Sequence, residues 1–250
     1  MFSRIWETIT FSMKTFTNLA LVENRTKWAK RVAPLTMLFL VGGLIVNFMS
    51  ISQPQYFQYA VVMLGLGFLM SIISSHLVNH WVREPRADQA LAVALKKFGN
   101  DFYLFNYTAA KASHVLLTPT RLYVIIPKRH AGEVQVKGRR FSRKFSFVRV
   151  LRFFAEEGLG TPVSEAQNHI KSVQQALSSQ LDEETVPEIK GLVVFTNKEI
   201  KLSISDPVIP VLTISDLKLY LRGHDKNKAI PADVRNQLVK ILSEGHQEVK

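Results

Sequence analysis

The sequence predicts a two-helix membrane hairpin followed by an α/β domain. Two apolar runs near the start, at residues 33–49 and 56–78, contain no Asp, Glu, Lys or Arg and are separated by the short polar linker SISQPQ. A helix rises about 1.5 Å per residue, so about 20 apolar residues match a hydrocarbon core about 30 Å thick. Short helical and strand patterns alternate through the rest of the chain. We therefore expect a hairpin at residues 32–80 and a tethered domain behind it.

Basic residues indicate how this hairpin is oriented. Lys and Arg occupy six positions before it and occur again at positions 83 and 86, but none lies in the connecting loop. The positive-inside rule then places both termini in the cytoplasm, and we expect the protein in a bacterial inner membrane. The chain has no cysteine. Disulfides, thiolate zinc sites and iron–sulfur clusters are therefore excluded.

The leader at residues 1–31 has an amphipathic pattern. Its apolar residues recur at spacings of three and four, and they are Phe2, Ile5, Trp6, Ile9, Met13, Phe16 and Ala20. This spacing predicts a helix. Because an apolar run follows at once, we expect the helix to lie in the membrane interface. The alternative is a helix that packs on the domain.

The first half of the domain is predicted to contain one helix and a series of strands. Residues 86–98 have helical spacing, with Leu91, Leu95 and Phe98 facing inward, and Gly99-Asn100 ends the helix. The strands expected next lie at residues 102–107, 114–118 and 121–126, with further candidates at 132–136 and 145–151. Pro119-Thr120 supplies a turn, so the second and third strands should form a hairpin.

The second half alternates helices and strands again. Thr161-Pro162 is typical of a helix start, and this helix should run to about Leu181. The run GLVVF at residues 191–195 is apolar throughout, as expected for a central strand buried on both faces. Shorter strands are expected at 200–204 and 208–212, and helices at 215–221 and 231–242.

The order of these elements resembles the nuclease-related domain, or NERD, family. The motifs that carry the resemblance are Ala87-Asp88, SHVLL at 113–117, YVIIPK at 123–128, Gly132-Glu133, PVSEAQ at 162–167 and GLVVF at 191–195. The resemblance implies a restriction-endonuclease-like mixed-sheet domain of the PD-(D/E)xK type. The chain then divides into the leader at 1–31, the hairpin at 32–80, the NERD-like domain at 86–222, and a C-terminal helix and tail at 223–250.

The residues of the implied nuclease site are mostly replaced. In the family pattern a strand Asp and a strand Glu hold Mg²⁺ and a Lys positions the attacking water. Ser113 stands at the Asp position and Ile126 at the Glu position, while Lys128 is kept and Asp88 matches the first-helix acid. A hard divalent ion needs converging oxygen ligands, preferably carboxylates. We therefore expect these positions to be vestigial, with no catalytic residue, metal or cofactor. Mg²⁺ would be needed only if the chain is a nuclease.

A basic segment follows this site. Residues 128–152 contain nine Lys or Arg and one acidic residue, interleaved with phenylalanines. Such a segment suits nucleic acid or an anionic lipid surface. The simpler alternative is a strand with phenylalanines inward and solvated charges outward. The candidate polyanion-binding residues are Lys137, Arg139, Arg140, Arg143, Lys144 and Arg149.

Three functions are compatible with these patterns. The leading hypothesis is a membrane-anchored, non-catalytic nuclease-related domain that binds a polyanion or a partner protein at the cytoplasmic membrane surface. One alternative is a Mg²⁺-dependent nuclease that acts on DNA near the membrane. The other is a structural subunit whose hairpin assembles with further membrane proteins.

Overall fold

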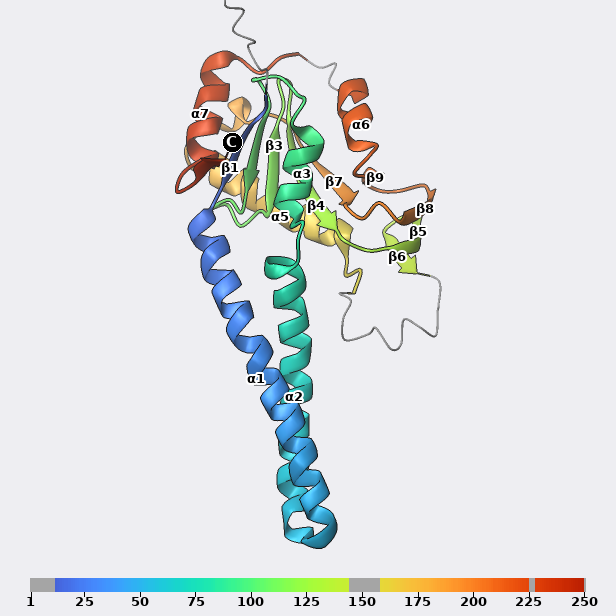
Figure 1. Cartoon of the computed structure of the whole chain (residues 1–250). Helices are drawn as coiled ribbons and strands as arrows, with labels where there is room; N and C mark the ends of the chain where they lie inside the picture. The colour runs from blue at the N-terminus through green and yellow to red at the C-terminus, as the bar shows by residue number, and fades with distance from the viewer. Residues whose placement is uncertain (1–11, 144–157, 225–227, 250) are drawn as a thin grey trace, which may run out of the picture.

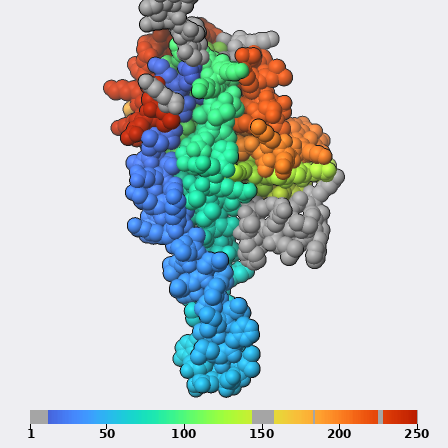
Figure 2. Space-filling model, viewed as in Figure 1, coloured from blue at the N-terminus to red at the C-terminus, as the bar shows by residue number. Residues whose placement is uncertain are grey.

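The computed structural model describes residues 12–143, 158–224 and 228–249. Two long antiparallel helices project from one end of an α/β domain (Figure 1), and Figure 2 shows them as a slender extension of a broader body. Helix α1 spans Leu19–Ser52 and α2 spans Phe57–Leu77, with a 3-10 turn at Pro54–Tyr56 between them and a π-helical turn at Val78–Val82 after α2. Both helices are long and apolar enough to cross a membrane. The predicted two-helix hairpin is confirmed, and α1 begins well before residue 33.

Small residues bring α1 and α2 together. The buried residues are Val22, Ala29, Thr36 and Gly43 in α1, and Ala60, Gly67 and Ser74 in α2. Successive members are seven residues apart, which is the repeat of a left-handed helix pair. A Cβ added at Gly43 would lie 2.9 Å from the Leu64 side chain, and one at Gly67 would lie 2.8 Å from Leu40. The helices therefore approach more closely than larger side chains would allow.

A seven-stranded mixed sheet, in the order β10-β1-β2-β3-β4-β7-β9, forms the centre of the domain. Its strands are β1 Lys14–Thr17, β2 Tyr103–Asn106, β3 His114–Leu117, β4 Leu122–Lys128, β7 Ile189–Phe195, β9 Val211–Thr213 and β10 Gln247–Val249. β3 is antiparallel to β2 and β4, whereas β7 is parallel to β4 and β9. The predicted strand hairpin is confirmed, and β7 is buried from Gly191 to Phe195 as expected for a central strand.

A second sheet of three strands, in the order β6-β5-β8, lies beside the first. Its strands are β5 Gly132–Lys137, β6 Arg140–Arg143 and β8 Ile200–Ser205. β5 and β6 form a tight hairpin that turns at Gly138, whose φ is +57°. The strands predicted at 132–136 and 200–204 are confirmed, and the one predicted at 145–151 lies outside the described residues.

Helices cover both faces of the main sheet. Helices α3, Ala87–Leu95, and α6, Leu217–His224, pack on one face, while α5, Pro162–Ser178, and α7, Ala232–Leu242, pack on the other. The predicted inward residues Leu91 and Leu95 are fully buried. Helix α5 ends before Leu181, and the Thr161 side chain makes no capping hydrogen bond, although the helix begins where predicted.

The leader differs from its prediction. Lys14–Thr17 form β1, parallel to β2 and antiparallel to β10, so the helix predicted over these residues is wrong. Met13 and Phe16 reach the cores on opposite faces of the sheet. Pairing with two strands buries this segment more completely than an exposed amphipathic helix would, and this outweighs its helical spacing. Residues 19–30 are helical as part of α1, and residues 1–11 lie outside the described chain.

Candidate functional site

The β3–β4 hairpin carries three of the predicted site positions. Val115 pairs with Val124, Ser113 directly precedes β3, and Ile126 and Lys128 lie in the last part of β4. Lys128 follows Ile126 by two residues and therefore shares its face of the sheet. β3 begins and β4 ends at the end of the sheet from which the helical hairpin projects (Figure 1). The strand framework implied by the resemblance is present.

The side chains at the first two positions offer no carboxylate. Ser113 has a neutral hydroxyl, and Ile126 is 3% exposed and belongs to the apolar core beneath α5. In the described ranges, no group of three or more His, Asp and Glu side chains is placed to hold a metal ion. Ser113 and Ile126 therefore do not supply carboxylate ligands for Mg²⁺, which requires several oxygen ligands in a near-octahedral arrangement.

Lys128 instead contacts a carboxylate that the sequence did not reveal as its partner. Its Nζ donates to Glu165 Oε1 at 3.0 Å and Oε2 at 2.8 Å, and Glu165 lies in the first turn of α5. Gly160 covers this pair with φ +63°, and a Cβ there would lie 2.7 Å from Glu165 Oε1. An acid in the first turn of a helix is common because the helix dipole favours it. Nothing local in the sequence indicates that it reaches Lys128.

His169 lies one turn after Glu165 on α5. Burial lowers its pKa, while the neighbouring Glu165 raises it and Lys128 lowers it further. Its Nδ1 is buried and has no hydrogen-bond partner among the residues that the structure describes. This end of α5 thus combines an ion pair with an imidazole that stays neutral more readily than an exposed one.

Asp88 is separated from this group. It is 4% exposed in the first turn of α3, where Arg86 Nε and Nη2 donate to its two oxygens at 3.1 and 3.0 Å. The Tyr107 hydroxyl donates to it at 3.4 Å, and burial raises the pKa of that hydroxyl. Helix α3 covers the face of the sheet opposite α5. Within the described chain, no hydrogen bond or ion pair joins Asp88 to Lys128.

His114 forms a buried polar chain with β2 and β1. Its Nδ1 is 2.8 Å from Asn106 Oδ1, and Asn106 Nδ2 donates to Thr17 Oγ1 at 3.0 Å. Because Asn106 Oδ1 can only accept, Nδ1 carries the proton and Nε2 is an acceptor. Nε2 is buried and has no partner in the described part of the chain. Burial lowers the pKa of His114 to about 3, so the ring is neutral. Sequence reasoning did not identify this residue as important.

The predicted polyanion-binding residues lie mainly on the β5–β6 hairpin. Lys137, Arg139 and Arg140 are exposed, and Arg143 is half-buried with Nη2 donating to the Ala131 carbonyl at 3.2 Å. Arg139 Nη2 donates to Gln167 Oε1 of α5 at 2.7 Å. The hairpin therefore lies against the helix that carries Glu165. The other two candidates, Lys144 and Arg149, lie outside the described residues.

The comparisons with known proteins agree with this architecture. Residues 81–196 match the family model of the nuclease-related domain. The chain thus carries a NERD domain behind two helices that could cross a membrane. No curated protein and no solved structure gave a match. The matched range includes β2 to β7, whereas β1 and β10 of the same sheet lie beyond it.

Proposed function

We propose that this chain is a membrane-anchored, non-catalytic nuclease-related domain that binds a polyanion through the β5–β6 hairpin. The observation that carries the proposal is that Ser113, directly before β3, and Ile126, in the apolar core of β4, stand where metal-dependent cleavage would need carboxylates. Lys128, the remaining member of the pattern, is bound by Glu165. A domain that keeps the strand framework, lacks the metal ligands and presents exposed cations is suited to holding a phosphate chain without cutting it.

The helical hairpin of α1 and α2 would anchor this domain on the cytoplasmic side of the membrane. Basic residues precede α1's apolar run and follow α2, and none lies between them. The positive-inside rule favours a cytoplasmic position for such flanks. The pairing of β1 with β10 supports an even number of spans, because a strand before α1 and a strand after α2 belong to one sheet and so lie on one side of the bilayer.

Charge reversal on the β5–β6 hairpin tests the polyanion proposal. The full chain in mild detergent is titrated with fluorescent single-stranded DNA and RNA, with anisotropy as the readout. Arg139→Glu combined with Arg140→Glu should weaken binding by at least about tenfold, and affinity should fall steeply with salt because bound counterions are released. The matched control, Lys96→Glu with Lys97→Glu, makes the same charge change at exposed positions after α3 and should bind like the unaltered chain. Absence of binding at low salt would refute the proposal.

The nuclease alternative is favoured by one observation, the Glu165 carboxylate 2.8 Å from Lys128. If the proposal is right, Lys128→Ala, Glu165→Gln and Asp88→Ala change no rate, because the unaltered chain cleaves nothing. Mg²⁺-dependent cleavage of DNA that disappears in Lys128→Ala and in Glu165→Gln would establish the alternative instead.

A further inference from the structure

The packing of α1 against α2 fixes the height of the domain above a bilayer. Gly43 faces Leu64, Gly67 faces Leu40, and Thr26 Oγ1 donates to the Trp81 carbonyl at 3.1 Å. The residue numbers of each pair add to the same total, so one antiparallel register runs along both helices. Trp81 therefore lies level with Thr26. Thr26 precedes the apolar run, which starts at residue 33, by seven residues.

This register places the base of the domain close to the headgroups. Seven helical residues rise about 10 Å, and the headgroup layer extends about 5–8 Å beyond the hydrocarbon core. The Trp81 ring packs on Tyr107 with 4.9 Å between centroids. Arg129 donates to the carbonyls of Arg83 and Glu84 at 2.8 and 2.7 Å. These contacts hold the base of the domain at the level of Trp81, just above the headgroup layer.

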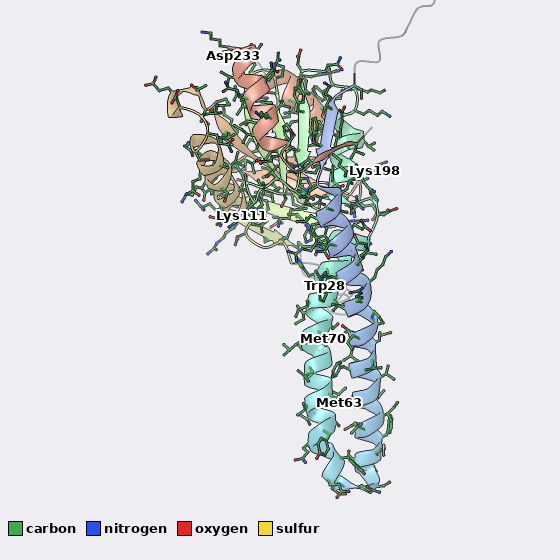
Figure 3. The ribbon with its side chains drawn as sticks, turned by 90° about the vertical axis from the view of Figure 1, so that its left-hand side faces the viewer. Trp28, Met63, Met70, Lys111, Lys198 and Asp233 are labelled. Carbon is green, nitrogen blue, oxygen red and sulfur yellow. The ribbon has the colours of Figure 1, made fainter. Side chains whose placement is uncertain are left out.

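Strand directions determine which loops face the bilayer. β1 leads directly into α1, and β2 runs parallel to β1, so the β2–β3 loop lies at the same end of the sheet. Lys111 of this loop is exposed, and Figure 3 shows it at the base of the domain, toward the helical hairpin. The opposite end carries the β3–β4 turn, where the Ile230 amide donates to the Pro119 carbonyl at 2.7 Å and α7 begins nearby. The two ends can therefore be labelled separately.

Exposed cations lie on the elements that meet at this base. We define the basal collar as Arg25, Lys30 and Arg31 of α1, Arg83 of the linker, and Lys111. The acidic residues of the two long helices and the linker are Glu23, which pairs with Lys27 at 2.7 Å, and the exposed Glu84. The potential of an anionic bilayer falls off over a Debye length of about 8–10 Å. Arg25, Lys30 and Arg31 precede residue 33 by two to eight residues, which is about 3–12 Å along the helix, so these members of the collar lie within that range of the headgroup layer.

We propose that the basal collar binds the anionic phospholipid headgroups of the bilayer that holds the hairpin, and so keeps the domain seated on the membrane in one orientation. Lipid is favoured over nucleic acid because most of the collar lies on α1 and the linker, between the domain and the apolar runs, where a nucleic acid would have to enter the narrow space between domain and bilayer. Trp28, 55% exposed on the same part of α1, suits an interfacial position (Figure 3). These residues differ from those of the β5–β6 hairpin, so the two proposals can fail independently.

The absence of cysteine permits a direct test with single dyes. Ala109→Cys labels the β2–β3 loop without removing a charge, and Ala232→Cys labels the start of α7. The full chain is reconstituted into vesicles of phosphatidylcholine, with or without phosphatidylglycerol, that contain an acceptor dye on some headgroups. Energy transfer from position 109 should rise when phosphatidylglycerol is present and return to its lower value at high salt. Transfer from position 232 should show no such rise.

Charge reversal then identifies the residues responsible. Arg83→Glu with Lys111→Glu should abolish the rise at position 109, whereas Lys96→Glu with Lys97→Glu should retain it. If energy transfer from position 109 is the same with and without phosphatidylglycerol, the proposal is overturned, whatever the β5–β6 hairpin binds. So would a loss of oligonucleotide binding in Arg83→Glu with Lys111→Glu while the lipid response persists, because the collar would then be a nucleic-acid site.

Discussion

His114 links the stability of the domain to pH through a single buried ring. Its pKa is about 3 in the folded chain, because burial disfavours the charged form, and 6.5 for the exposed side chain. Between these values the unfolded chain binds a proton that the folded chain does not bind. The contribution is therefore fully present above about pH 6.5, and it is lost as pH falls toward 3.

Replacing this ring should flatten the acid side of the stability profile. From pH 7 to pH 5, His114→Gln should reduce the fall in the free energy of unfolding by up to about 2 kcal/mol, since each pH unit in this window corresponds to about 1.4 kcal/mol. Urea unfolding of the full chain in detergent at several pH values measures this slope. His224→Gln, at an exposed position of α6, should keep the original slope. Equal slopes for both variants would contradict the role assigned to His114.

At the scale of the elements, the stability of the α1–α2 pair should respond differently to substitution of two glycines. Gly67→Leu should lower the unfolding temperature in mild detergent, because its Cβ would lie 2.8 Å from Leu40 and overpacking costs about 1–3 kcal/mol. Gly65→Leu is the matched control, since a Cβ there meets nothing within 4 Å. Circular dichroism during heating compares the two variants. A larger loss for Gly65→Leu would show that the helices pack in another register.

β1 makes the domain larger than its family match. Phe16 of this strand packs against one core and Met13, directly before the strand, belongs to the other, while β1 lies between β2 and β10. A chain of residues 81–250 should therefore be unstable or aggregate, because the β2 edge and its apolar neighbours become exposed. Replacing residues 19–80 by a flexible linker of about a dozen residues should restore a soluble, cooperatively unfolding domain, since both attachment points lie at the base. Equal stability of the two chains in urea would contradict this role of β1.

At the scale of the whole molecule, the sequence predicts elements better than it predicts their distant partners. The apolar runs, the strand hairpin and the GLVVF strand carry strong local patterns, and the structure confirms all of these elements. β1 and β10 are four and three residues long, and each is stabilised by neighbours far away in the chain. The Lys128–Glu165 pair joins residues 37 positions apart. Local periodicity contains no signal for contacts of this kind.

Topology gives a prediction for the intact protein. Reporters fused at residue 53 and at the C-terminus should report opposite sides of the membrane, because basic residues flank the hairpin and its loop has none. A reporter at the N-terminus should agree with the one at the C-terminus, since β1 and β10 pair. Identical signals from residue 53 and the C-terminus would exclude the two-span arrangement.

The pairing of β1 with β10 also constrains the order in which the protein is made. β1 leaves the ribosome before α1 and α2, and β10 leaves it long after them, yet the two strands are neighbours in one sheet. In a chain inserted as proposed, the helical hairpin enters the bilayer while β1 still lacks both of its partner strands. A nascent chain whose N-terminus slipped across the bilayer would have no strand to join β2 to β10. The sheet can therefore close only in molecules whose first step of insertion was correct.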